Sequence, residues 1–176
     1  MSNHVVSYAS GLPLAIKLWA SYLFGKSIRE WKCCLNGLED NIPTELFQRL
    51  EDNIPTELFQ IFQLTFNGLN KTKKEVFLLM ACFFSGEDRN RTTDILDSLG
   101  LFPNYLLGVL VDKSLLNVSL DGKGLWMHTV VQQMGREIVC RECPEWLPED
   151  IDAVLTDNKV SNYVEIFNLN IDPLYY

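Results

Sequence analysis

The sequence has no hydrophobic run long enough to span a lipid bilayer. The longest covers residues 76–84, whereas a transmembrane helix needs about 20 predominantly apolar residues. Residues 1–4 lack the basic region and apolar core of a signal peptide. Basic residues are also few: 15 Lys and Arg stand against 23 Asp and Glu, so the net charge is −8. Because such a field repels polyanions, we expect a protein that binds neither nucleic acid nor an anionic membrane.

The motifs of the common enzyme sites are missing as well. No Gly-x-x-x-x-Gly-Lys-Ser/Thr loop occurs, so the chain lacks the backbone cradle, lysine and hydroxyl that P-loop enzymes use for phosphates and magnesium. Its five cysteines, an odd number without framework spacing, indicate reduced thiols in a cytoplasmic protein. We therefore predict no catalytic residue, and we expect that this polypeptide is not an enzyme by itself.

Cysteine chemistry and metal binding are equally weakly indicated. Cys140 and Cys143 have redox-motif spacing, but no thioredoxin-like strand–helix pattern surrounds them. A zinc site would need two more ligands near them in the sequence, and none is evident. A Cys–His nucleophile built from His128 and a distant cysteine has no local support. We predict no metal site.

What the sequence does contain is typical of a globular protein. Hydrophobic residues make up 47% and charged residues 22% of its 176 residues, enough for one ordinary domain or two small ones. After a turn at residues 10–13, residues 14–24 are apolar on most faces, which predicts a central helix of a small bundle. Pro13 suits the first position of that helix. Residues 27–35 predict a second helix.

A tandem repeat follows these helices. Residues 38–48 recur as residues 50–60, at a period of twelve. Twelve residues rotate a helix by about 120° from its starting phase, so the two copies cannot share one buried stripe. We infer a local duplication in which one copy is docked and the other is surplus.

The second half of the chain predicts three helices and a β-hairpin. Thr72 and Glu75 have capping-box spacing and precede a helix over residues 76–84 that must be buried nearly all round. Residues 92–99 predict a short helix, and a third begins at Pro103 with Leu106, Val109 and Leu110 on one face. Residues 114–120 and 125–127 predict strands.

Asp121 and Gly122, between these strands, give a strong hairpin signal. Trp126 and Met127 are expected in the core of the hairpin. Three helices followed by a hairpin is the order of a winged helix. The predicted fold is therefore mainly α: a small helical bundle followed by a winged-helix subdomain with one β-hairpin.

His128 lies where the returning strand gives way to a helix. Val130, Val131, Met134 and Ile138 recur at helical spacing, so that helix begins near His128 or Thr129. The first turn of a helix has unpaired N–H groups and a partial positive charge. A histidine there is placed to help hold an anion such as a phosphate. The alternative is an imidazole that is only packed or at the surface.

These features together resemble a known family, the plant intracellular immune receptors with nucleotide-binding and leucine-rich-repeat domains. The subclass resembled carries an N-terminal Toll/interleukin-1-receptor domain, and the resemblance runs from about residue 5 to about residue 171. The matching motifs, in order, are Gly11-Leu12-Pro13-Leu14-Ala15, Ala81-Cys82-Phe83-Phe84, Asp112-Lys113-Ser114-Leu115, Met127-His128 and Gln133-Met134-Gly135-Arg136-Glu137-Ile138-Val139.

The resemblance implies a division into a helical subdomain at residues 1–69, a winged-helix subdomain at 70–141, and a connector towards leucine-rich repeats at 142–176. In this family the subdomains close over ADP in the resting receptor and rearrange when ATP replaces it. Pro13, followed by Leu14 in the apolar turn, matches the proline that packs against the adenine. His128 matches the histidine that reaches the β-phosphate. The implied role is conformational control in plant defence signalling, with the nucleotide-binding core and leucine-rich repeats of the parent receptor as partners.

Three departures from the family pattern matter. The phosphate-binding loop is absent, so nucleotide binding by this chain alone is not expected. The family has aspartate after its Met-His pair, where this chain has Thr129. Both residues can cap a helix. Threonine, however, lacks the negative charge with which aspartate would favour protonation of His128, so we predict a weaker resting lock. The duplication is the third departure.

Two other functions remain open at this point. A winged helix can bind DNA, with its third helix, residues 103–112, as the reader; that segment holds no Lys or Arg and predicts packing instead. The chain could also be an inert, truncated receptor fragment.

Overall fold

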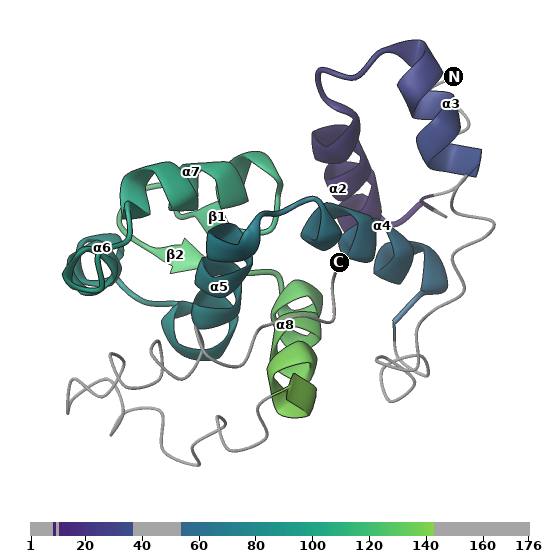
Figure 1. Ribbon diagram of the computed structural model, residues 1–176. Helices are drawn as coiled ribbons and strands as arrows, with labels where there is room; N and C mark the ends of the chain where they lie inside the picture. The colour runs from purple at the N-terminus through teal and green to yellow at the C-terminus, as the bar shows by residue number, and fades with distance from the viewer. Residues whose placement is uncertain (1–8, 10, 37–53, 143–176) are drawn as a thin grey trace. The chain divides into compact units, whose positions relative to one another are not determined.

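A computed structural model describes residue 9 and residues 11–36 and 54–142 (Figure 1). The first copy of the repeat, the start of the second copy and the predicted connector beyond residue 142 lie outside the described residues. The chain divides into two compact units, residues 1–69 with 112–114 and residues 70–111 with 115–176.

The described residues are mainly helical, with one antiparallel hairpin, as the sequence predicts. In the first unit the elements are α2 (Pro13–Leu23), α3 (Ile28–Asn36) and α4 (Thr56–Asn67). In the second unit they are α5 (Lys71–Leu79), the π-helix η2 (Met80–Phe84), α6 (Arg89–Ser98), α7 (Pro103–Asp112), β1 (Asn117–Val118), β2 (Leu125–Trp126) and α8 (Thr129–Glu142). No helix in the described part of the chain is both long and apolar enough to cross a membrane.

The core of the first unit lies between α2 and α4. Helix α2 begins at Pro13 directly after the extended Leu12, as predicted. Its buried face includes Leu18 and Trp19, and α4 contributes Ile61 and Phe62, all at most 1% exposed. Helix α4 packs against α2, and burial of these large apolar side chains is the main force that holds such helices together.

The second copy of the repeat meets this core. Pro55 lies immediately before α4, and Ile54, Leu58 and Phe59 are at most 5% exposed. These residues are therefore docked in the first unit. That the other copy is surplus stays a prediction, which deletion of residues 38–49 tests through the melting temperature.

Residues 76–84 form the centre of the second unit. Every side chain in this segment is at most 5% exposed, so the prediction of near-complete burial is confirmed. The predicted capping box is wrong. Asn70 is the N-cap, and its side chain accepts from Lys73 N at 3.1 Å. Thr72 lies inside the first turn, and Glu75 is buried instead of reaching back.

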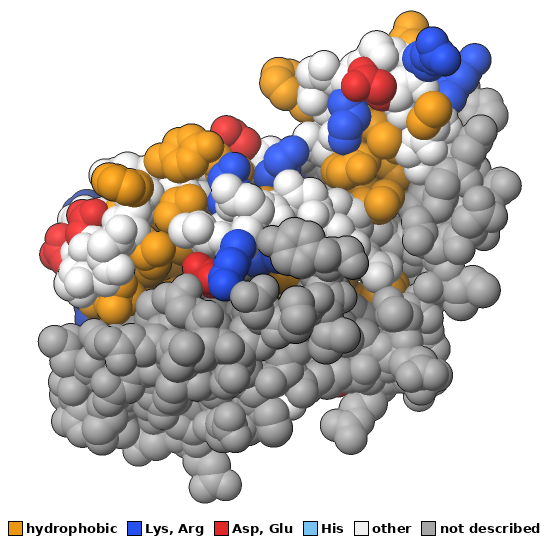
Figure 2. Space-filling view, viewed as in Figure 1, with side chains coloured by type: hydrophobic (Ala, Val, Ile, Leu, Met, Phe, Trp, Pro, Cys, Tyr) orange, Lys and Arg blue, Asp and Glu red, His pale blue; other side chains and the backbone are white. Residues whose placement is uncertain are grey.

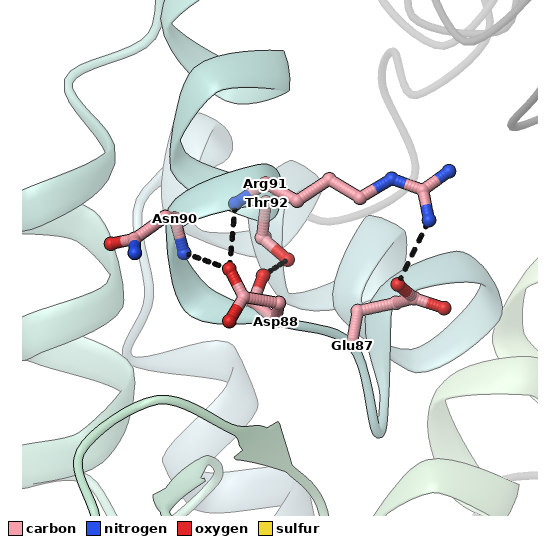
Figure 3. Close-up of polar contacts among 5 residues, drawn as sticks. All are labelled: Glu87, Asp88, Asn90, Arg91 and Thr92. Carbon is pink, nitrogen blue, oxygen red and sulfur yellow. Dashed lines mark hydrogen bonds and ion pairs between the residues drawn. The ribbon is translucent and has the colours of Figure 1, made fainter.

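Helix α6 begins three residues before the predicted start because Asp88 caps it (Figure 3). Asp88 Oδ1 accepts from Asn90 N at 2.9 Å and from Arg91 N at 3.1 Å. The Thr92 hydroxyl donates to Asp88 O at 2.9 Å, and Arg91 pairs with Glu87 at 3.4 Å. Such a cap satisfies N–H groups that the first turn leaves unpaired.

Helix α7 begins at Pro103, as predicted, but its buried face is shifted. Leu106 and Leu110 are buried, and so is Leu107, whereas Val109 is half-buried. On the visible face hydrophobic side chains gather over α7 (Figure 2), where Phe102 and Tyr105 are 80% and 63% exposed.

The hairpin is shorter than predicted. Strand β1 pairs with β2 only through Asn117 with Trp126 and Val118 with Leu125. Upstream, the N–H groups of both Leu115 and Leu116 donate to Leu110 O at the end of α7, so these residues are not available for a strand. Trp126 is 45% exposed, which corrects its predicted place in the core, whereas Met127 is buried at 5%.

Candidate functional site

His128 is the residue at which β2 passes into α8. Its carbonyl accepts from Gln132 N at 2.9 Å, the first bond of the helix. Its ring nitrogen Nδ1 accepts from the N–H of Val130 at 3.3 Å. His128 is therefore the N-cap of α8, with its side chain doing what Ser, Thr or Asp do in most helices. The helix begins at Thr129, as the sequence predicts.

This cap determines which way the imidazole can act. An Nδ1 atom that accepts a hydrogen bond carries no proton, so in the neutral ring the proton lies on Nε2. The side chain is exposed. His128 thus presents an N–H donor to solvent beside the positive end of a 14-residue helix. That combination suits an oxygen anion such as phosphate.

Backbone hydrogen bonds hold the chain in front of His128. The segment after η2 runs along the free side of β2: Gly86 N donates to Leu125 O at 2.7 Å, and Leu125 N donates to Glu87 O at 3.0 Å. Met127 N donates to Ser85 Oγ at 3.3 Å. Strand β2 is therefore bonded on both sides, which fixes the residue that directly precedes His128.

The turn of the hairpin is closed by its own polar residues. Asp121 Oδ1 accepts from the Ser119 hydroxyl and from Lys123 N. These hydrogen bonds, that of Ser119 above all, lower the pKa of Asp121 below its usual value. Gly122 has a φ of +75°, a conformation that glycine adopts without strain. The predicted Asp-Gly turn is confirmed.

Behind His128, α8 packs on η2 and α5 through an interface that the sequence did not reveal. Gln132 Nε2 and Arg136 Nε both donate to Ala81 O, at 3.0 and 3.1 Å. At Gly135 a Cβ atom would lie 2.7 Å from Ala81 Cβ and 3.1 Å from Phe77 Cε1. The one signal in the sequence was a glycine inside a helical pattern. Glycine destabilises a helix relative to alanine, so its presence there indicates a packing reason.

Pro13 and Leu14 belong to the first unit. Pro13 is the first residue of α2 and is exposed, and Leu14 is half-buried. An exposed proline ring beside a partly exposed leucine offers an apolar surface. His128 belongs to the second unit.

Burial changes the chemistry of two other titratable groups. Desolvation raises the pKa of Cys82 to about 12, so its thiol stays protonated and unreactive. Desolvation also raises the pKa of Glu75, against the opposing charge of Lys71. Within residues 11–36 and 54–142, no group of three or more His, Cys, Asp or Glu side chains is arranged to hold a metal ion.

Comparison with known proteins finds a family that resembles most of the second unit. Residues 70–143 match the family described as the winged-helix domain of Roq1-like disease resistance proteins. This part of the chain is therefore similar to that winged-helix domain, and the predicted fold class, mainly α with one β-hairpin, is confirmed.

The similarity extends over most of the chain. The TMV resistance protein N of Nicotiana glutinosa is 32% identical over 164 residues, 90% of this chain. Disease resistance protein RUN1 of Vitis rotundifolia is 33% identical over 182 residues, 99% of this chain, and RPP2A of Arabidopsis thaliana is 31% identical over 179 residues, 98% of this chain. The chain is thus homologous to plant disease resistance proteins, and it spans about 13% of the length of these relatives.

Proposed function

We propose that this chain acts as the ADP-sensing regulatory region of a plant immune receptor of the class with a Toll/interleukin-1-receptor domain. In this role it holds the resting receptor closed over ADP and rearranges when ATP replaces ADP. The observation that carries the proposal is the cap of α8, in which His128 Nδ1 bonds Val130 N and leaves Nε2–H exposed. Homology to resistance proteins over at least 90% of the chain supports the same role.

His128 is proposed to donate from Nε2 to the β-phosphate of ADP. A hydrogen bond to a charged acceptor contributes about 1.5–3 kcal/mol, which corresponds to about a 10- to 150-fold change in affinity. The N-terminus of α8 adds a favourable field at the same place. Pro13 and Leu14 are proposed to pack against the adenine, for which an apolar turn is suited.

The partners in this proposal are a nucleotide-binding core and a leucine-rich-repeat domain. The core must supply the phosphate-binding loop and the magnesium ligand, because no such loop occurs in this sequence. We accordingly expect no nucleotide hydrolysis by this chain alone. A cytoplasmic location is part of the proposal.

A pair of substitutions at His128 separates its two hydrogen bonds. In His128→Asn the amide oxygen replaces Nδ1, so the cap is kept and the outer donor is lost. In His128→Gln a donor remains near the position of Nε2, and the short-range cap is lost. For the assay, the chain is fused downstream of a nucleotide-binding core with a phosphate-binding loop and is loaded with labelled ADP. The measured quantity is the rate at which the labelled ADP is released when it is displaced.

We expect His128→Asn to release ADP about tenfold faster or more, while His128→Gln retains part of the slow release. If His128→Asn releases ADP at the wild-type rate, the proposed phosphate contact is wrong. If the fused wild-type chain itself holds ADP no longer than the core alone, the chain has no ADP-sensing role. That result would favour the alternative of an inert receptor fragment.

The DNA-binding alternative receives no support from α7. Its exposed side chains include Asn104, Tyr105 and Asp112, none of which is a cation, and its visible surface is largely apolar (Figure 2). A groove-reading helix needs basic and hydrogen-bonding side chains on that face. Salt-dependent binding to duplex DNA in a mobility-shift assay would restore this alternative.

A further inference from the structure

The carbonyl of Ala81 lies where helical bonding along α5 and η2 ends. In a π-helix a carbonyl accepts from the N–H five residues further on, which for Ala81 belongs to Gly86. Gly86 N instead donates to Leu125 O in the hairpin. The last carbonyls of a helix need partners from elsewhere, and Ala81 is fully buried at 0% exposure. Another element must therefore supply the donors.

Two side chains of α8 supply them. Gln132 Nε2 and Arg136 Nε approach Ala81 O to 3.0 and 3.1 Å. The two residues lie one turn apart on a stripe that continues to His128, four residues before Gln132. Arg136 also brings a positive charge to the C-terminal end of a helix, where the helix dipole favours it.

Gly135 restricts this arrangement to one register of α8. It is the only glycine of the helix, and an added Cβ would lie 2.7 Å from Ala81 Cβ. A slide of one turn would bring Val131 or Val139 to the same place, and their branched side chains do not fit there. A slip of one residue would rotate His128 by about 100° and move it by about 1.5 Å along the axis.

We propose that Gln132 and Arg136 are positioning residues for His128. By donating to the Ala81 carbonyl they fix the axial position of α8, and so the direction in which the imidazole at its N-terminus points. This inference rests on the proposed function in one respect only, namely that the imidazole of His128 contacts the phosphate. Neither residue bonds the ring, so both act through the helix.

The test uses the ¹⁵N-labelled chain of residues 1–176 and the same fusion with a nucleotide-binding core. Gln132→Met removes one donor without adding charge, and Gln133→Met, at the exposed neighbouring position, is its matched control. Arg136→Met removes the other donor, and Arg136→Lys restores one. Three quantities are measured: the imidazole ¹⁵N shifts of His128, hydrogen exchange at the Val130 amide, and the rate of ADP release.

Gln132→Met and Arg136→Met are expected to speed exchange at Val130 about three- to tenfold and to mix the His128 tautomers. Gln133→Met leaves both unchanged, and Arg136→Lys restores them in part. In the fusion the same two variants release ADP faster. Exchange in α6 and α7 stays at its wild-type rate, because the effect is confined to α8.

Two results overturn the inference. One is wild-type behaviour of Val130 and His128 in both variants. The other is faster exchange throughout α6, α7 and α8, which a general loss of stability produces. A third result separates the two proposals: if Val130 and His128 respond but His128→Asn does not change ADP release, the positioning role stands and the phosphate contact fails.

Discussion

Replacing Gly135 by alanine tests the packing that seats α8. The new Cβ would lie 2.7 Å from Ala81 Cβ and 3.1 Å from Phe77 Cε1, whereas carbon atoms in favourable contact are about 3.5–4.0 Å apart. The Ala81 methyl is attached directly to the backbone and cannot rotate away. Helix α8 must therefore move by about 1 Å, and such overpacking costs about 1–3 kcal/mol.

Gly108→Ala is the matched control. Gly108 lies inside α7, and an added Cβ there meets nothing within 4 Å. Alanine is favoured over glycine in a helix by about 1 kcal/mol, and this gain is common to both substitutions. The difference between the two variants therefore isolates the overpacking, and we expect Gly135→Ala to be less stable than Gly108→Ala by about 1–3 kcal/mol.

Urea denaturation gives the free energies of unfolding, and hydrogen exchange at the amides of Met134 and Ile138 assigns the loss to α8. Adding Ala81→Gly to the Gly135→Ala variant removes the clashing methyl, so the two substitutions should couple favourably by about 1 kcal/mol or more. Equal stability of Gly135→Ala and Gly108→Ala, or no coupling with Ala81→Gly, would refute the close approach of the two helices.

Two further substitutions and one chemical modification test the chemistry of individual groups. Burial raises the pKa of Glu75 in the folded state, so the folded chain holds this proton more tightly and its stability falls as pH rises through the range between the unfolded and folded pKa values. Glu75→Gln should therefore raise the melting temperature at pH 7.5 and have little effect below about pH 4; the same gain at both pH values contradicts this. The pKa of Cys82 is raised to about 12, so at pH 8 only about one thiol in ten thousand is ionised. Iodoacetamide should modify the exposed Cys33 well before Cys82, as mass spectrometry of peptides can follow, and equal rates would show that Cys82 is accessible. Thr129→Asp adds a negative charge in the first turn of α8, beside His128, and should slow ADP release from the fusion; an unchanged rate counts against a role for this position in the resting lock.

Much of the fold follows from patterns within short stretches of sequence. The start of α2 at Pro13 and the turn at Gly122 each depend on a residue whose backbone preference is strong. The start of α8 after His128 follows from the helical spacing of its apolar residues. The burial of residues 76–84 follows from an unbroken apolar run. Such local signals hold because few long-range contacts compete with them.

Three other features were mistaken, because a pattern in the sequence does not show which of several possible contacts forms. The strand predicted from residue 114 is cut short because Leu115 and Leu116 bond back to Leu110. Trp126 is exposed, although its apolar neighbours suggest a core position. The cap of α5 is Asn70, whose side chain accepts from Lys73 N, and not Thr72, which fits the capping pattern.

The place of His128 at the start of α8 was predictable, but the hydrogen bonding of its ring was not. A histidine at a strand–helix junction is expected near a helix N-terminus, but periodicity does not tell which ring nitrogen accepts a hydrogen bond and which carries the proton. That Nδ1 caps the helix and leaves Nε2 outward depends on a bond to Val130. The interaction of Gln132 and Arg136 with Ala81 joins residues about fifty positions apart, and no pattern within one helix reveals such a pair.

The most direct test of the role of His128 is the structure of the chain fused to a nucleotide-binding core with ADP bound. The quantity to measure is the distance from His128 Nε2 to the nearest β-phosphate oxygen. A distance of about 2.7–3.2 Å, with Nδ1 still bonded to Val130, is the result we expect. An imidazole turned away from the nucleotide, or separated from every phosphate oxygen by more than about 4 Å, would contradict the proposed contact.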